Sequence, residues 1–187
     1  MTSRFDVRPT SFDGVTVLER SIVEDSRGFL ERLFCAEELR PFVQNRTIVQ
    51  INRTVTYRRG TVRGMHFQNP PHAELKLVSC LRGRVFDVVV DLRRGSSTFL
   101  HWHSEILAEG NKKTIIIPEG FAHGFQALAD HSELLYFHTA AYNATAEGGL
   151  NARDPRLAIS WPEPITEMSP RDHSHPILGT GFTGLAL

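Results

Sequence analysis

Short apolar runs, broken at close intervals by glycine and proline, constrain the fold of this chain more than any other feature. The 187 residues include 14 glycines and 10 prolines. Between these breaks, Val, Ile, Leu and Phe alternate with polar residues at a period of two, which is typical of half-buried β-strands. A chain of this length is expected to form a single domain over residues 1–187, with a core over about 15–160 and a C-terminal wrap over 161–187.

The expected strands crowd into the first 140 residues. The clearest two cover 75–81 and 85–92, joined at Arg82-Gly83 by a tight turn of the kind found in hairpins. The others cover 15–18, 29–34, 47–52, 62–67, 99–107, 114–117, 121–128 and 133–139. One short helix is expected over 36–42, with its length limited by Pro41. Strands do not alternate with long helices, so we predict an all-β jelly-roll barrel with a few short helices.

Charge and cysteine content exclude several classes of partner and compartment. Lys and Arg together number 21, as do Asp and Glu, so no global field favours nucleic acid or an anionic membrane. Cys35 and Cys80 lie far apart and predict neither a C-x-x-C site nor a disulfide framework, which fits a reducing compartment. The N-terminal residues lack the apolar segment of a signal peptide, and no apolar run is long enough to span a bilayer. We therefore expect a cytoplasmic protein.

The alternation also predicts which polar side chains share a strand face with apolar ones. In the strand over 62–67, Arg63 and Met65 are predicted on one face and His66 on the other. Other single polar residues predicted on faces with apolar neighbours are Lys76, Asp87, Asp91, Tyr136 and His138. Taken alone, each has an ordinary structural explanation, so a function depends on their combination.

Two kinds of chemistry compete for these residues. A metal-dependent cupin would use His101 and His103 from one strand and His123 from the Pro-x-Gly-x-x-His segment. Metal-free proton transfer beside a ketone needs a base, a donor facing the enolate oxygen and an acid. His66, Lys76 and Tyr136 are residue types that suit these three roles, in that order.

Eight segments of the chain match one enzyme family. They are DSRGF (25–29), VQIN (49–52), VRGMHFQNPP (62–71), LKLVSCLRGRVFDVVVDLRRGSSTF (75–99), IPEGFAHGF (117–125), LLYFHTAAYN (134–143), DPRLAISWP (154–162) and SPRD (169–172). Over about 15–178 the chain resembles the dTDP-4-dehydrorhamnose 3,5-epimerases, which are dimeric, cupin-fold enzymes of nucleotide-sugar metabolism. The resemblance therefore implies a cupin-type jelly roll and a homodimer in which the N-terminal strand of one subunit joins its neighbour's sheet.

The resemblance also implies the roles of individual residues. His66 corresponds to the general base, Asp172 to the aspartate that pairs with it, Lys76 to the catalytic lysine and Tyr136 to the acid on the opposite face of the sugar. Residues implied to contact the substrate are Arg27, Phe29, Gln50, Asn52, Arg63, His123, Tyr142, Glu147 and Arg171. Among these, Arg27 and Arg63 would hold the diphosphate, and Tyr142 would stack on the nucleobase.

The implied reaction converts dTDP-4-dehydro-6-deoxy-D-glucose to dTDP-4-dehydro-L-rhamnose by epimerisation at carbons 3 and 5. It implies no cofactor and no metal, because the ketone of the substrate itself acidifies the hydrogens on the neighbouring carbons.

Two departures from the family pattern lie near the implied site. Arg32, with Glu31 beside it, stands where glutamate is usual on the nucleotide side, and Glu74 stands where glutamine is common. The alternatives are a single-carbon epimerase of a dTDP-, CDP- or GDP-linked 4-keto sugar, and a metal-dependent or non-catalytic sugar-binding cupin.

Overall fold

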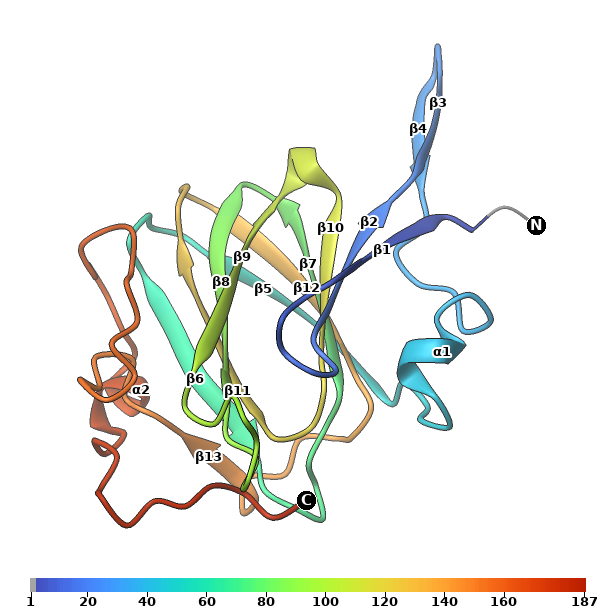
Figure 1. Cartoon of the computed structure of the whole chain (residues 1–187). Helices are drawn as coiled ribbons and strands as arrows, with labels where there is room; N and C mark the ends of the chain where they lie inside the picture. The colour runs from blue at the N-terminus through green and yellow to red at the C-terminus, as the bar shows by residue number, and fades with distance from the viewer. Residues whose placement is uncertain (1–2) are drawn as a thin grey trace.

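Two antiparallel β-sheets face each other in a computed structural model that describes residues 3–187 (Figure 1). The six-stranded sheet has the order β1 (Phe5–Pro9), β2 (Thr16–Arg20), β10 (Lys113–Ile117), β7 (Lys76–Arg82), β12 (Ser132–His138), β5 (Gln50–Thr56). The five-stranded sheet has the order β13 (Glu147–Gly149), β6 (Val62–Gln68), β11 (Phe121–Ala127), β8 (Arg84–Asp91), β9 (Trp102–Ala108). The chain is thus an all-β, cupin-type jelly roll, and the predicted fold class is confirmed.

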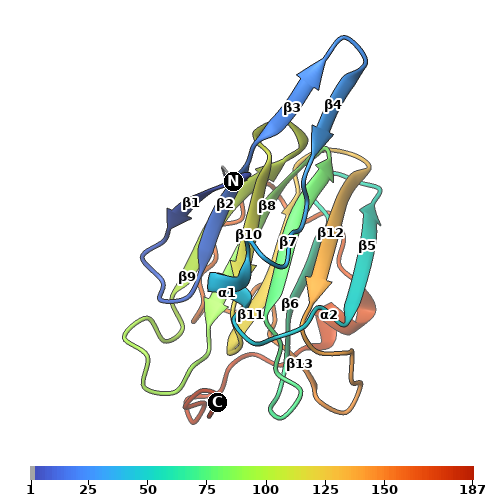
Figure 2. The same cartoon turned by 90° about the vertical axis from the view of Figure 1, so that its right-hand side faces the viewer.

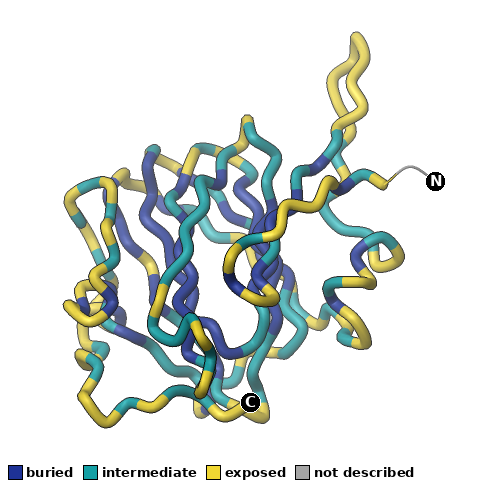
Figure 3. Tube along the Cα trace, viewed as in Figure 1, coloured by how far each residue is buried: buried dark blue, intermediate teal, exposed yellow. Residues whose placement is uncertain are grey.

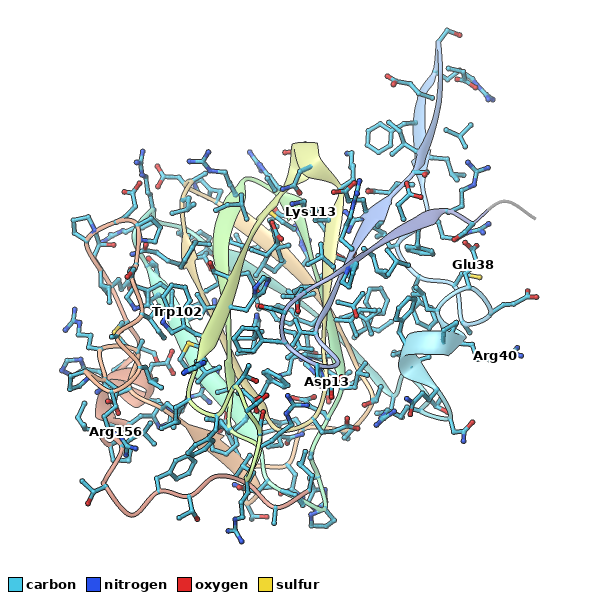
Figure 4. All side chains as sticks on the ribbon, viewed as in Figure 1. Asp13, Glu38, Arg40, Trp102, Lys113 and Arg156 are labelled. Carbon is cyan, nitrogen blue, oxygen red and sulfur yellow. The ribbon has the colours of Figure 1, made fainter. Side chains whose placement is uncertain are left out.

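The period-two alternation of the sequence separates the residues into inner and outer faces. The inner faces of the two sheets form one apolar core, to which Val78 and Leu134 contribute from one sheet and Val89 and Phe125 from the other. The outer face of the five-stranded sheet packs against the C-terminal wrap, and Figure 4 shows Trp102 on this side. The outer face of the six-stranded sheet is covered by the segment that contains α1 (Arg40–Val43). Both faces of each sheet are therefore buried over much of their area (Figure 3).

The predicted hairpin over residues 75–92 is wrong in one respect. Both strands form, as β7 and β8, but they belong to different sheets and do not pair with each other. Gly83 occupies the turn with a φ of +76°, where a Cβ atom would lie 3.1 Å from Ser132 Cα. The tight turn thus passes the chain from one layer to the other, and the unpaired inner faces leave room for a cavity.

The helices also differ from the expectation. The helix predicted over 36–42 is shorter and begins only at Arg40. Pro41 was expected to limit the end of the helix, but it lies in the first turn, where a residue without an N–H is tolerated. The C-terminal wrap contains a second short helix, α2 (Pro170–Ser174), and a 3₁₀ turn, η1 (Glu109–Asn111), follows β9. No helix within residues 3–187 is long and apolar enough to cross a membrane.

One two-stranded hairpin projects from the body of the molecule. It consists of β3 (Ile22–Asp25) and β4 (Gly28–Glu31) and extends beyond the ends of both sheets (Figures 1 and 2). Its side chains are mostly exposed, including the apolar residues Val23, Phe29 and Leu30. An exposed apolar hairpin of this kind is typical of a surface that contacts another protein.

Candidate active site

A cavity of about 240 Å³ opens between the inner faces of the two sheets. Ten of the thirteen predicted site residues line it: Gln50, Asn52, Arg63, His66, Lys76, His123, Tyr136, Tyr142, Glu147 and Arg171. Asp172 lies directly behind one of them, His66. The structure therefore brings together eleven residues that the sequence spreads over more than 120 positions.

Both Arg63 and His66 face the cavity, although strict alternation predicted them on opposite faces of their strand. The pairing of β6 with β11 is interrupted, because His66 pairs with His123 and Arg63 pairs with Phe125. Two residues of β6 thus lie opposite Gly124 alone, and such a bulge shifts the alternation by one position. Met65, inside the bulge, points away from the cavity into the core beneath the C-terminal wrap.

His66 and Asp172 form a close pair at the mouth of the cavity. His66 Nε2 lies 2.7 Å from Asp172 Oδ1, and the side chain of His66 is 28% exposed. A carboxylate can only accept a hydrogen bond, so this contact places the imidazole proton on Nε2 and leaves Nδ1 free to take up a proton. Burial opposes ionisation of Asp172, but its hydrogen bonds to His66 and to the Gly64 N–H hold its pKa well below the ordinary value of 3.8.

The short helix α2 fixes the position of Asp172. Ser169 is its N-cap, and the Ser169 hydroxyl accepts a hydrogen bond of 3.0 Å from the Asp172 N–H. Pro170 occupies the first turn, as is common just after a serine cap. The helix thereby turns the Asp172 carboxylate towards β6, where one oxygen contacts His66 and the other accepts from the Gly64 N–H at 3.1 Å.

Lys76 lies on the opposite sheet with its ammonium group almost completely buried. Its Nζ is 3.0 Å from Glu74 Oε1, and the second oxygen of Glu74 is 2.7 Å from His138 Nδ1. Burial disfavours the Glu74 carboxylate, but the His138 hydrogen bond and the Lys76 charge outweigh it and lower its pKa from 4.5 to about 2. Glu74 is therefore an anion that bridges two residues of the cavity wall.

Tyr136 shares this wall with Lys76, since both lie on the six-stranded sheet. Burial and the nearby charge of Asp87 raise the pKa of the Tyr136 phenol well above its ordinary value of 10. Its ring contacts His123 from the facing sheet edge-on, with the ring centroids 6.1 Å apart. His123 is in turn paired with the buried Asp87 at 2.8 Å. Tyr136 thus keeps its proton at neutral pH and can act as a donor.

A ring of polar side chains surrounds the rest of the cavity. Tyr142 donates its hydroxyl to Glu147 at 3.0 Å, and Glu147 pairs with Arg171 at 2.9 Å. The Tyr142 N–H donates to Gln50 Oε1 at 3.0 Å, and Asn52 lies 3.4 Å from His138 Nε2. This ring offers hydrogen-bond donors, a guanidinium group and an exposed aromatic face, which are the groups that suit a nucleotide.

Arg27 and Phe29 do not lie at the cavity of their own chain. Arg27 is at the tip of the hairpin of β3 and β4, where its side chain is 88% exposed and pairs with Asp25 at 2.6 Å. Phe29 is 56% exposed, and its ring lies beneath the ammonium group of Lys112. Their predicted contact with substrate is possible only if the hairpin reaches the cavity of another subunit.

The metal alternative was based on His101, His103 and His123, and the structure does not support that cluster. His123 is held by Asp87, whereas the His103 ring packs beside Phe12, and its Nε2 is buried without a partner. Within residues 3–187, only one set of histidine, cysteine or carboxylate side chains gathers closely enough to hold a metal ion. This set is His66, Asp172 and His175.

Three residues with close contacts at the site were not among the predicted ones. Asp87 orients His123, and Glu74 with His138 holds Lys76. The alternation had placed Asp87 and His138 on faces shared with apolar neighbours, and Glu74 stood out as a departure from the family pattern. The signal was therefore present, but the pairing between strands was needed to show which side chains meet.

Comparisons with known proteins agree on one family. The sequence profile of the dTDP-4-dehydrorhamnose 3,5-epimerases matches residues 9–180. The chain is 38% identical to the dTDP-4-dehydrorhamnose 3,5-epimerase of Sinorhizobium fredii, with 89% of each chain covered. It is 36% identical to the dTDP-4-dehydrorhamnose 3-epimerase of Streptomyces niveus, with 92% of this chain and 83% of the relative covered.

Solved structures give the same result. The chain superposes with a TM-score of 0.86 on the dTDP-6-deoxy-D-glucose-3,5-epimerase of Legionella pneumophila, which was crystallised in complex with dTDP-4-keto-L-rhamnose. The identity is 37%, and 91% of each chain is covered.

Proposed function

The chain belongs to the dTDP-4-dehydrorhamnose 3,5-epimerase family, and from that membership we propose that it epimerises carbons 3 and 5 of dTDP-4-dehydro-6-deoxy-D-glucose to give dTDP-4-dehydro-L-rhamnose. One observation supports this reaction above all others. His66, the candidate base, projects from the five-stranded sheet, and Tyr136, the candidate acid, projects from the sheet that faces it. Inversion at a carbon needs a proton removed from one face and returned to the other.

The proposed chemistry follows from these positions. Nδ1 of His66 takes the hydrogen from the carbon beside the ketone, and Asp172 stabilises the imidazolium that forms. The electron pair moves onto the ketone oxygen, and the ammonium group of Lys76 stabilises the resulting enolate. Tyr136 then delivers a proton to the opposite face of the carbon. The imidazolium then releases its proton to solvent and the tyrosinate takes one up, after which the same steps at the second carbon complete the reaction with no net change in protons or electrons.

We also propose that the enzyme works as a homodimer. The observation that supports this proposal is the separation of Arg27 and Phe29 from the cavity of their own chain, on a projecting and exposed hairpin. Two subunits related by a two-fold axis could each place this hairpin at the other's cavity. The diphosphate would then be held by Arg63 of one subunit and Arg27 of the other.

Two free thiols, Cys35 and Cys80, agree with the proposed cytoplasmic location.

An exchange experiment tests the reaction. The purified protein is incubated with dTDP-4-dehydro-6-deoxy-D-glucose in deuterated water, and deuterium is measured at each carbon by NMR. We expect label at carbons 3 and 5. Label at one carbon alone would support the alternative of a single-carbon epimerase, to which the similarity with the Streptomyces niveus 3-epimerase lends weight. Label at neither carbon would remove the proposed activity.

A further inference from the structure

His175 lies beside the proposed base and takes no part in the chemistry described above. Its ring meets the ring of His66 edge-on, with the centroids 6.0 Å apart. One donor atom from each of His66, Asp172 and His175 lies within 4.8 Å of the other two. Two imidazoles and a carboxylate form a donor set that suits zinc and neighbouring transition metals.

The Nε2 atom of His175 is buried and has no hydrogen-bond partner among the described residues. Buried nitrogen atoms of side chains are normally satisfied, so an orphan beside a carboxylate and a second imidazole calls for a partner such as an ion. The His175 ring lies over Gly149, where only a glycine leaves room for it, since a Cβ at Gly149 would lie 2.1 Å from His175 Nε2. Asn151 donates a hydrogen bond of 3.1 Å to the His175 carbonyl and so anchors the backbone.

From this arrangement we propose that His66, Asp172 and His175 form an inhibitory binding site for a divalent transition-metal ion of the zinc class. A zinc ion bound at 2.0–2.1 Å in tetrahedral geometry needs its ligand atoms about 3.3 Å apart. The His66–Asp172 contact of 2.7 Å must therefore open slightly, and the three donor atoms, which lie within 4.8 Å of one another, must draw closer around the ion. A water molecule would supply the fourth ligand.

The inhibition follows from the position of one proton, and this part rests on the proposed function. Without metal, the contact with Asp172 keeps the imidazole proton of His66 on Nε2 and leaves Nδ1 as the base. A metal ion bound to Nε2 takes the place of that proton, which moves to Nδ1. The neutral ring then has no lone pair available, and His66 cannot accept a proton from the substrate.

Arg171 is a cation whose charge opposes metal binding at this site. Its guanidinium group lies 3.2 Å from His66 Nε2 and 3.5 Å from Asp172 Oδ1. Its closest contact, however, is with Glu147, and its side chain is 52% exposed, so it can remain paired with Glu147 while a metal ion takes its place beside His66. Removal of this charge should therefore strengthen metal binding.

Zinc binding is measured directly by competition with a chromophoric zinc chelator, which does not depend on catalysis. We expect one zinc ion per chain in the full-length protein, and affinity weakened at least about tenfold in His175→Ala. His173→Ala is the matched control, because His173 is exposed in α2, two residues before His175, and lies outside the cluster. This variant should bind zinc like the wild type. Arg171→Gln should bind zinc more tightly. If His175→Ala does not fold, His175→Gln retains most of the side-chain volume but lacks the ligating ring.

Equal zinc affinity in the wild type and a folded His175 variant would overturn the proposal, as would no tightening in Arg171→Gln. The exchange assay then tests inhibition. Zinc should stop deuterium incorporation in the wild type at the concentration at which it binds, EDTA should restore it, and magnesium should have no effect. Zinc that binds through His175 without slowing exchange would overturn the inhibitory role and contradict the assignment of His66 as the base.

Discussion

The phenol of Tyr136 is buried against His123, and this environment determines whether Tyr136 can act as an acid or as a base. Because its pKa is raised, it holds its proton and can donate it, but it cannot act as the base. We predict that Tyr136→Phe still exchanges hydrogen through His66 but forms the inverted product at least about 100-fold more slowly. NMR of the same reaction in deuterated water measures both quantities. Inversion at the wild-type rate would show that the acid is another residue.

Glu74 makes the stability of the protein depend on acid pH. Its folded-state pKa of about 2 lies below its ordinary value of 4.5, so its ionisation stabilises the fold above pH 4.5, and this contribution is lost as the pH falls from 4.5 towards 2. We predict that the free energy of unfolding of the wild type falls in this window by up to about 3 kcal/mol more than that of Glu74→Gln. Urea unfolding at a series of pH values measures the difference.

Glu163→Gln is a suitable control for this experiment, because Glu163 also has a lowered pKa and pairs with an arginine, Arg59, but that pair lies at the surface. Exposed ion pairs contribute little to stability. The variant should therefore follow the wild-type dependence on pH. If Glu74→Gln also follows it, the bridge from Glu74 to Lys76 and His138 does not stabilise the folded state.

At the scale of single residues, most of the cavity lining could be predicted from the sequence, because the resemblance to the family rests on short local motifs. The R-G-x-H segment and the K-L-V segment each carry one residue that lines the cavity, His66 and Lys76. The bridge through Glu74 could not be predicted in this way. It depends on the pairing of β12 with β7, which sets His138 opposite Lys76, and alternation within one strand carries no information about its partner.

At the scale of elements, the bulge in β6 is what turns His66 into the cavity together with Arg63. Gly64 has a φ of +124°, and a Cβ there would lie 2.5 Å from Gly124 Cα on β11. We predict that Gly64→Ala lowers the free energy of unfolding by about 2–4 kcal/mol and reduces activity, because the two strands must separate. Gly110→Ala, at a glycine with open space around it, should change stability by less than about 0.5 kcal/mol. Equal stabilities of the two variants, measured by denaturant unfolding, would contradict this account.

The bulge also explains one wrong prediction, and the shortness of α2 explains why that helix was not predicted. Strict alternation placed Arg63 and His66 on opposite faces, because a period of two cannot register an inserted residue. The helix over Pro170–Ser174 was missed even though Ser169-Pro170 is a recognisable helix start, since five residues are too few to show a helical period. The strands themselves, with their apolar inner and outer faces, were largely predictable from the pattern.

At the scale of the whole molecule, the projecting hairpin predicts that a complete site needs two subunits. Arg27→Ala and His66→Ala subunits, each inactive alone, should regain activity when co-expressed, since a mixed dimer has one site with both residues intact. Random assortment gives about one quarter of wild-type activity. His66→Ala co-expressed with Lys76→Ala is the control and should show no recovery, because both residues line the same cavity. No recovery in the first mixture would mean that Arg27 does not serve a neighbouring site.

The sheet order and the hairpin could not be predicted from patterning alone. Strands β7 and β8 are adjacent in sequence and yet lie in opposite layers, because a two-residue turn can either pair two strands or pass between sheets. The exposed apolar residues of β3 and β4 are explained if the hairpin contacts a second subunit, as proposed above. The sequence therefore predicts which segments form strands better than it predicts which sheet each strand joins.

The central claim is that one imidazole removes the hydrogen at both carbons, and deuterium incorporation by His66→Ala tests it most directly. The variant is compared with the wild type and with His173→Ala, whose histidine is exposed and outside the cavity, after each is shown to be folded. We predict no incorporation at carbon 3 or carbon 5 in His66→Ala and wild-type incorporation in His173→Ala. Near-native incorporation at either carbon in His66→Ala would contradict the account.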